Sequence, residues 1–578
     1  MSYDLLFQQA LRLHESGHFD EAEQIYRQIL ETAPDNPDVL NLLGLIAQAK
    51  GIHNQAVELF YKAVRQAPRH APFYFNLALS LNAWGKYQEA LDNYEKALKL
   101  SPELKEAFNN IGNIYKKLGS RQKAADNYRK AAALDDNYAE PRANLAMLDR
   151  DQTALEELTR RFPDDALSFY FLAIINYENG ETDKAGKYAE QADRLSPCNN
   201  SIKLLSGLIF LKQNQTTKAK ICFEKALIYN PLSTEAHINL ANIETNLGDF
   251  ETAEQHYLRA LDIDPSALDA HINYADMLYR QKRLHEALEE YRKAVILNPG
   301  VPEISNNLAL ILKDLGEYEE ALGLLFNALL KRPQQEEFSI NTAETLTALF
   351  RQKPDDARKI AAKWIAFAPE NPFARRVNAA FNGGTDLENN QIYAEKLFDH
   401  FADNYELVLK NIDYGVVRSL RDLTGNVEGT LVDLGCGTGL AGEAYQAPGA
   451  RLVGVDISEK MLQKAAEKGI YEKLIKSDIA EYLKTKPRAD LFLAADVFAY
   501  LGNIEPVIKA VAPQKIAFST ENSAAPEYTL TSSGRFAHNP AYIENLLHTH
   551  GYADITKTTT TLRLENGRPV DGTLWLAR

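Results

Sequence analysis

The stretch LVDLGCGTGLAGEAY, residues 431–445, is an apolar run that reaches an acidic residue and continues into three glycines spaced two residues apart. The acid is Asp433, and the glycines are Gly435, Gly437 and Gly439. Glycines leave bare backbone where a ligand can approach closely, and this loop leads into the start of a helix. The stretch therefore predicts a strand, a ligand-binding loop and a helix.

The chain around this loop alternates between predicted strands and helices. An amphipathic helix over 392–412 comes first, and helical patterns separate the strands that follow. Such alternation predicts a parallel, doubly wound sheet, and Asn566-Gly567 near the end predicts a closing antiparallel hairpin. The strands are predicted near 430–434, 451–456, 472–477, 489–494 and 515–520.

Acidic residues lie at the ends of the first three predicted strands, namely Asp433, Asp456 and Asp478. Since the carboxyl ends of parallel strands meet at one edge of a sheet, these acids are expected to share one cofactor site. Nicotinamide-binding folds use a related glycine loop, so the loop alone leaves two cofactor classes open. The acids around it favour a methyl donor.

Seven strands that end in a hairpin resemble the class I methyltransferase fold. The resemblance implies that S-adenosylmethionine is the cofactor and that Asp433 helps to hold its cationic methionine end. It implies that Asp456 accepts hydrogen bonds from both ribose hydroxyls. The next residue, Ile457, is expected to belong to the same cofactor site. Asp478 is expected to bond the adenine amino group, and Ile479 to supply a main-chain donor.

Residues 3–335 repeat with a period of 34 residues, as the series Ala22, Ala56, Ala90 and Ala124 shows. The pattern resembles the tetratricopeptide family, in which small residues let paired helices approach. The stretch near 150–165 is too short for a complete second helix, and a degenerate unit over 336–370 is expected to close the array. Units are predicted to begin near Tyr3, Pro37, Ala71, Lys105, Ala139, Ala166, Asn200, Thr234, Leu268 and Pro302.

Asparagine occupies the sixth position of six units. In a stacked array this places carboxamides in rows along the concave wall, where each can donate to and accept from an extended peptide. The rows resemble the asparagine ladder of O-linked N-acetylglucosamine transferase, which implies a protein or peptide partner. The alternative is that these asparagines bond neighbouring helices to each other. The six are Asn76, Asn110, Asn144, Asn239, Asn273 and Asn307.

The segments LAADVFAYLGNIEPVI and FDHFADNYE are similar to those of a bacterial family of predicted methyltransferases that carry tetratricopeptide repeats. The resemblance implies that Phe398 and Tyr405 close over the cofactor. It places Asp496, just after the fourth strand, near the reacting methyl or the methionine amino group. The substrate does not follow from the resemblance.

Methyl transfer is an in-line displacement, so a base is needed only when the acceptor must lose a proton. His538 lies in a predicted loop after the fifth strand and titrates near neutral pH, which makes it the first candidate base. The alternative role for His538 is to cap the helix that begins near Pro540. Arg535 is a candidate for orienting a carboxylate or closing the loop, and Tyr500 is a further catalytic candidate.

Composition excludes several classes of function. A net charge of −15 and the lack of an Asn-Pro-Pro-aromatic motif argue against a nucleic-acid substrate. Cys198, Cys222 and Cys436 have no metal-ligand spacing, so no metal is expected, and so few thiols suit a reducing cytoplasm. No apolar run reaches the roughly 20 residues that span a bilayer, and the start of the chain lacks the features of a signal peptide.

The sequence thus predicts an all-α tetratricopeptide superhelix over 1–370, a linker over 371–391 and a class I methyltransferase domain over 392–578. We expect a cytoplasmic S-adenosylmethionine-dependent methyltransferase that acts on a protein captured by the repeats. One alternative is a small-molecule methyltransferase that uses the repeats as an assembly platform. Another is a repeat scaffold whose cofactor domain is inactive.

Overall fold

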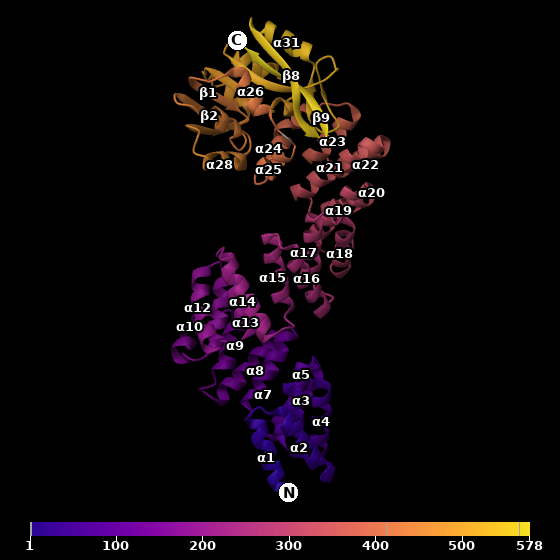
Figure 1. Ribbon diagram of the computed structural model, residues 1–578, viewed down its shortest axis with the longest axis vertical. Helices are drawn as coiled ribbons and strands as arrows, with labels where there is room; N and C mark the ends of the chain where they lie inside the picture. Colours follow the sequence, from indigo (N-terminus) through magenta and orange to yellow (C-terminus); the bar gives the residue numbers. More distant parts are fainter. Residues whose placement is uncertain (1–2, 413, 566) are drawn as a thin grey trace. The chain divides into compact units, whose positions relative to one another are not determined.

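A computed structural model describes residues 3–412, 414–565 and 567–578. Contacts divide the chain into two compact units, Met1–Ala267 and Leu268–Arg578. Figure 1 labels many of the helices and some of the strands. None of the helices in these described ranges is both long enough and apolar enough to cross a membrane.

The first unit is built from consecutive helix pairs, and each odd-numbered helix begins where the sequence predicts a repeat to begin. Helix α10 has 10 residues, whereas α8 and α12 have 14, so the irregular repeat lies where the sequence places it. The helices are α1 (Tyr3–Glu15), α2 (Phe19–Thr32), α3 (Pro37–Ala49), α4 (His53–Gln66), α5 (Ala71–Ala83), α6 (Tyr87–Leu100), α7 (Lys105–Lys117), α8 (Arg121–Leu134), α9 (Ala139–Asp149), α10 (Gln152–Arg161), α11 (Ala166–Glu178), α12 (Thr182–Leu195), α13 (Asn200–Lys212), α14 (Thr216–Tyr229), α15 (Thr234–Leu247) and α16 (Phe250–Ile263).

Close approach within a pair depends on a glycine that faces an aromatic ring. The Phe60 ring of α4 is fully buried, and a Cβ on Gly44 of α3 would lie only 2.7 Å from it. Gly112 of α7 faces Tyr128 of α8 in the same way, at 2.5 Å. The recurring aromatic residues therefore fill space that the small residues leave, as close packing of the interior requires.

The second unit begins with the remaining repeats and continues into a shorter helical region. Residues 371–391 were expected to form a linker, but α23 occupies most of this segment, and its Phe373, Val377 and Phe381 are buried in one core with α21 and α22. These apolar residues recur at a spacing of four, which produces one helical face. The helices are α17 (Leu268–Arg280), α18 (Leu284–Leu297), α19 (Pro302–Leu315), α20 (Tyr318–Lys331), α21 (Glu336–Gln352), α22 (Pro354–Phe367), α23 (Pro372–Asn382), η1 (Leu387–Asn389), α24 (Asn390–Phe401), α25 (Tyr405–Asn411) and α26 (Val416–Thr424).

A nine-stranded sheet follows, with parallel strands in the order β3-β2-β1-β4-β5. β9 pairs antiparallel with β5 and β8, as the sequence predicts for a closing hairpin. The predicted fold class, a helical repeat array followed by a Rossmann-like α/β domain, is confirmed. The elements are β1 (Gly429–Leu434), α27 (Leu440–Tyr445), β2 (Ala450–Asp456), α28 (Glu459–Glu467), β3 (Lys473–Lys476), α29 (Ile479–Leu483), β4 (Leu491–Ala494), η2 (Phe498–Tyr500), α30 (Glu505–Val511), β5 (Ile516–Asn522), β6 (Tyr528–Leu530), β7 (Phe536–His538), α31 (Pro540–Thr549), β8 (Ile555–Glu565) and β9 (Arg568–Ala577).

Both faces of the sheet are buried. In β1, Leu431 packs into a core with α26 and α27, whereas its neighbour Val432 packs into a second core with α30 and α31. Successive strand residues point to opposite faces, so two such cores are the result expected for a doubly wound sheet. The loop predicted after the fifth strand is instead a short hairpin, β6–β7, because β7 continues the sheet beside the last residues of β5.

Three contacts join the last repeats to the α/β domain within the second unit. Thr347 of α21 donates a hydrogen bond to the Ser532 carbonyl at 3.4 Å, and Arg351 pairs with Glu565 at 2.8 Å. Arg376 of α23 donates from Nε to the Gly534 carbonyl at 2.9 Å. The β6–β7 turn therefore rests against α21 and α23.

Candidate functional site

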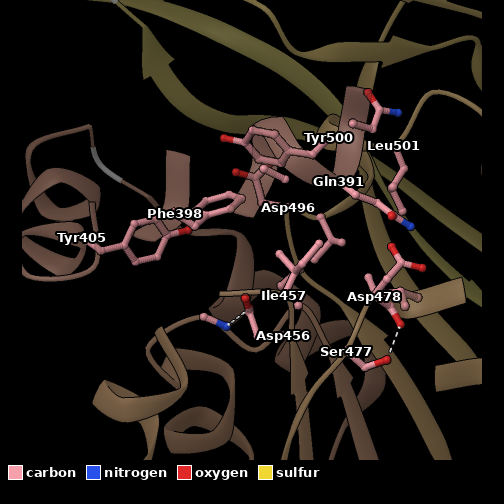
Figure 2. A pocket seen from close by; sticks show the side chains of 17 residues that line it. Gln391, Phe398, Tyr405, Asp456, Ile457, Ser477, Asp478, Asp496, Tyr500 and Leu501 are labelled. Carbon is pink, nitrogen blue, oxygen red and sulfur yellow. Dashed lines mark hydrogen bonds between the residues drawn. The ribbon is translucent and has the colours of Figure 1, made fainter. Parts of the chain in front are cut away.

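A cavity lies at the carboxyl ends of the parallel strands, and we call it the strand-end cavity. Helices α24 and α25 contribute its other wall, so the chain preceding the sheet also encloses it (Figure 2). Its lining is Asn390, Gln391, Ala394, Phe398, Tyr405, Gly435, Gly437, Asp456, Ile457, Ser477, Asp478, Ile479, Ala495, Asp496, Val497, Tyr500 and Leu501.

The glycine loop adopts backbone conformations that favour glycine. Gly435, Gly437 and Gly439 have φ values of 75°, 52° and 90°. A Cβ on Gly435 would lie 2.6 Å from Val497, and the Gly437 amide donates to Asp456 at 2.8 Å. Only the first two glycines line the strand-end cavity, because Gly439 packs against Tyr471 instead.

Two carboxylates on this wall are held by backbone amides. Asp456 is 7% exposed and also accepts from the Ser458 amide at 2.9 Å; its burial raises the pKa of its carboxyl. Asp478 caps α29 by accepting from the Ala480 and Glu481 amides at 2.8 and 3.2 Å. Figure 2 shows both acids in the cavity wall formed by the strand ends. Their orientation is therefore fixed by the loops that carry them.

Three aromatic rings gather in the same cavity. Phe398 of α24 makes edge contacts with Tyr405 of α25, at 6.1 Å between centroids, and with Tyr500 of η2, at 4.8 Å (Figure 2). Burial raises the pKa of Tyr405 and of Tyr500, so both phenols stay neutral at physiological pH. The structure thus brings together the two aromatic residues that the sequence assigns to the cofactor and one that it assigns to catalysis.

Asp433 lies beside the strand-end cavity rather than in it. It is 1% exposed and accepts a 2.6 Å hydrogen bond from the Tyr471 hydroxyl. Burial raises the pKa of its carboxyl to about 7. Asp433 lines a smaller cavity that shares Tyr405, Gly435 and Gly437 with the strand-end cavity, so the two spaces adjoin.

Asp496 belongs to a buried network of ions. Arg535 donates to Asp496 at 2.6 Å, to Glu521 at 2.5 Å and to the Tyr500 hydroxyl at 2.6 Å. Arg563 of β8 pairs with Glu521 at 2.9 Å. Burial opposes the charge on Arg535, but Asp496, Tyr500 and Glu521 outweigh it and raise the pKa of Arg535. Arg535 therefore positions Asp496 and Tyr500 and does not line the strand-end cavity.

Glu521 and Arg563 were missed by the sequence reasoning. They come from β5 and β8, and no motif or local spacing links them to Asp496. Asn390 and Gln391, at the start of α24, were missed because they fall in the segment expected to be a linker. They could have been found by starting the predicted amphipathic helix two residues earlier.

His538 does not reach the strand-end cavity, which corrects its prediction as a base. Its side chain is fully buried in β7, where Nε2 donates to the Gly502 carbonyl at 2.9 Å. Burial lowers its pKa. The capping alternative is wrong too, because Asn539 caps α31 by accepting from the Ala541 amide at 2.9 Å. The prediction failed because the segment that was expected to be a loop forms strand β7, which buries the His538 side chain.

Several asparagines of the predicted rows bond neighbouring helices. Asn76 donates to Asn41 at 3.0 Å, and Asn144, which is 5% exposed, donates to Asn109 at 3.1 Å. Asn307 donates to the Tyr291 hydroxyl at 3.0 Å. These contacts agree with the alternative in which the asparagines bond neighbouring helices to each other.

The remaining row positions are Asn110, Asn239 and Asn273. Asn110 is half-buried. Asn239 is half-buried and donates to the Glu235 carbonyl of its own helix at 2.7 Å, and Asn273 is half-buried. Peptide binding by the rows thus stays a hypothesis for Asn110, Asn239 and Asn273.

A larger cavity of about 620 Å³, which we call the repeat-side cavity, lies where the last repeats meet the α/β domain. Helices α19 and α21 contribute one wall, and the β6–β7 turn contributes another. Tyr500 lines both this cavity and the strand-end cavity. The last repeats thus contribute directly to a space beside the strand-end cavity.

Family models match two parts of the chain. Models of the tetratricopeptide repeat match residues 7–71, 152–199, 204–267, 247–302, 278–339, 78–119 and 105–138. A model described as a methyltransferase domain matches residues 432–513, which include the glycine loop, Asp456, Asp478 and Asp496. The chain combines tetratricopeptide repeats with a methyltransferase domain.

Solved structures resemble the chain more distantly. A tetratricopeptide repeat protein from Parabacteroides merdae is 21% identical, covers 41% of this chain and 97% of its own, and superposes with a TM-score of 0.37. The hetero-tetramer Cut9-Hcn1 is 11% identical, with 66% and 96% coverage and a TM-score of 0.34. No curated protein matches the chain.

Proposed function

We propose that this protein is an S-adenosylmethionine-dependent methyltransferase whose cofactor occupies the strand-end cavity. One observation carries the proposal: buried Asp456, the helix-capping Asp478 and the glycine backbone meet in one cavity within the methyltransferase domain. A nicotinamide cofactor could also use Asp456 for its ribose, but its pyrophosphate would lie at the glycine loop beside the Asp433 carboxyl, where charge repulsion disfavours it.

The residues present fit this cofactor. Asp456 offers a fixed carboxylate to ribose hydroxyls, and the first-turn amide of Ile479 has no acceptor within its own helix. Phe398, Tyr405 and Tyr500 offer aromatic surface to a sulfonium, which cation–π attraction favours. Asp433, in the adjoining cavity, offers a carboxylate to an ammonium group.

The bound cofactor would supply an activated methyl group. The chain's own residues then have to position the acceptor and exclude water, which are large contributions in displacement reactions. Tyr500 separates the strand-end cavity from the repeat-side cavity, and Arg535 fixes its hydroxyl. We propose that the acceptor approaches past Tyr500 from the repeat-side cavity.

We propose a protein as the substrate, with the repeats as its binding region. Support comes from α19 and α21, whose side chains line the repeat-side cavity, and from the general use of such repeats in protein binding. Asn110, Asn239 and Asn273 are the row positions proposed for main-chain contacts with the substrate. A small-molecule substrate is the second candidate, because about 620 Å³ lies within the range of small-ligand pockets.

The cofactor proposal is tested by replacing Asp456. Asp456→Ala is expected to weaken S-adenosylmethionine binding by about 1 to 3 kcal/mol in calorimetry, because the hydroxyls lose their buried acceptor. Asp554→Ala, which changes an exposed aspartate paired with Arg578, is the matched control and should bind normally. Unchanged affinity in Asp456→Ala, or tight saturable binding of NADH, would contradict the proposal. A native protein that binds the cofactor but never transfers its methyl group would support the inactive-scaffold alternative.

A further inference from the structure

The cations that line the repeat-side cavity are paired with carboxylates, with one exception. Its cations Lys313, Arg351 and Arg535 bind Glu344 at 2.7 Å, Glu565 at 2.8 Å and Asp496 at 2.6 Å. Arg376 is the one lining cation of the described residues that has no carboxylate partner. The remaining charged residue, Asp314, is exposed and accepts a 2.7 Å hydrogen bond from Tyr279.

Arg376 is held rigidly and is 1% exposed. Its guanidinium lies between the rings of Tyr393 and Phe536, at 4.8 and 4.6 Å from their centroids. Nε donates to Gly534 and Nη1 to Asn390, but Nη2 has no hydrogen-bond partner. A buried cation without a counter-charge is costly, so an anion in the adjacent cavity would stabilise this arrangement.

Among its described residues the strand-end cavity, where the methyl group would be transferred, also lacks an unpaired group that could accept a proton from the acceptor. The carboxylates of the repeat-side cavity are engaged, because Glu344 and Glu565 pair with cations and Asp314 accepts a hydrogen bond from Tyr279. The described lining of the two cavities contains no histidine. Asp496 is paired with Arg535, and the Tyr500 hydroxyl already accepts a hydrogen bond from the same guanidinium. Asp456 and Asp478 are bonded by backbone amides. These cavities therefore favour an acceptor that is already deprotonated at neutral pH.

Among protein nucleophiles, a carboxylate meets both conditions. It carries a single negative charge at pH 7, whereas thiols, phenols and ammonium groups are largely protonated there. We infer that the repeat-side cavity receives a carboxylate acceptor, opposite Arg376, and that the product is a methyl ester. This inference rests on the proposed function.

The step balances without a base. One carboxylate oxygen forms a bond to the methyl carbon while the bond from that carbon to sulfur breaks. The electron pair of the broken bond stays on sulfur, which becomes a neutral thioether. No proton is exchanged, and the negative charge of the acceptor and the positive charge of the sulfonium disappear together. Arg376 and Arg535 act as positioning residues for the acceptor and for Tyr500.

The chemistry of the product provides the first test. The full-length protein is incubated with S-adenosylmethionine carrying a radioactive methyl group and with host lysate, and the products are treated with mild alkali. Methyl esters release volatile labelled methanol, whereas methylated nitrogen or sulfur retains the label. Label in the macromolecular fraction identifies a protein acid, and label in the small-molecule fraction identifies a free acid. Alkali-stable label overturns the inference.

Replacing Arg376 tests the placement of the acceptor. Arg376→Met is expected to lower ester formation at least about tenfold at saturating S-adenosylmethionine, and Arg376→Lys to restore part of it. Saturation with the cofactor removes any effect on its affinity through Asn390, which Arg376 also bonds. Arg375→Met is the matched control, because Arg375 pairs with Asp386 and does not line the cavity. Full ester formation by Arg376→Met overturns the assignment to this cavity.

A measurement on the native protein keeps the inference testable if Arg376→Met does not fold. Propionate, which matches the glutamate side chain, should raise the melting temperature more than chloride at equal ionic strength and should inhibit labelling. Equal effects of the two salts overturn the inference. A protein that binds S-adenosylmethionine but forms no alkali-labile product also overturns it, whereas failure to bind the cofactor overturns the proposed function instead.

Discussion

Asp433 shows how burial changes the chemistry of one residue. Because its folded-state pKa of about 7 lies above the ordinary carboxyl value, the folded protein holds a proton that the unfolded chain releases near pH 4. Its contribution to stability is therefore greatest at low pH and falls as the pH rises toward 7. A cation beside Asp433 would favour the charged form.

This linkage predicts a pH-dependent affinity for S-adenosylmethionine. If the cofactor's ammonium group lies beside Asp433, binding below pH 7 must release the carboxyl proton, so affinity should rise as the pH increases from about 5.5 to 7 and then level off. The expected change approaches tenfold per pH unit at most. Calorimetry in two buffers of different ionisation enthalpy measures the released proton directly.

Asp433→Asn separates this group from others that titrate. The variant should bind more weakly above pH 7 and should lose both the pH dependence and the proton release. A pH dependence that persists in Asp433→Asn would show that another group is responsible.

At the scale of elements, the asparagine pairs hold successive first helices of the repeats together. Asn144 of α9 donates to Asn109 of α7, and Asn341 of α21 donates to Asn306 of α19 at 2.8 Å. Each acceptor is 1% exposed, so its oxygen cannot turn to water if the donor is removed. The asparagine pairs therefore stabilise the repeat array.

Asn144→Ala is expected to destabilise the repeats by about 1 to 3 kcal/mol, because it leaves the buried Asn109 oxygen unpaired. Asn239→Ala is the matched control: its carboxamide bonds its own helix, and alanine favours helix formation, so its effect should stay within about 0.5 kcal/mol. Differential scanning calorimetry on the full chain measures both. Equal shifts in melting temperature for the two variants would contradict the structural role of Asn144.

At the scale of the whole molecule, the cover of the strand-end cavity is linked to the last repeats of the second unit. Asn390, at the start of α24, lines the cavity and accepts a hydrogen bond from Arg376 of α23. Arg376 also contacts the β6–β7 turn. Opening α24 to admit a ligand would therefore disturb contacts on both sides of it.

Cofactor binding should thus be visible in amide exchange of the cover. At about 100 times the dissociation constant, S-adenosylmethionine stabilises the bound state by about 2.7 kcal/mol, which slows exchange by up to about 100-fold where opening requires its release. Peptides from 390–411 should slow, and peptides from 37–134 should not. Hydrogen–deuterium exchange with mass spectrometry measures this, with Asp456→Ala as the control. Unchanged exchange over 390–411 would contradict a covering role.

The sequence by itself determined the repeats, the first five strands and the closing hairpin, because all of them follow from local patterns. The alanine and aromatic positions recur with the period of one helix pair, and Gly44 and Gly112 fit the rings that the period brings opposite them. The meeting of Asp456 and Asp478 in one cavity was predictable for a related reason: parallel strands bring their carboxyl ends together whatever lies between them.

Only the tertiary structure decided the side of the site that faces the last repeats. Arg535 meets Asp496 and Glu521 through a hairpin that has no local signature, and that hairpin also buries His538. Arg376 is positioned by its hydrogen bond to Gly534, which lies 158 positions further along the chain. Such pairings depend on which segments pack together, and a helix or strand period cannot encode that choice.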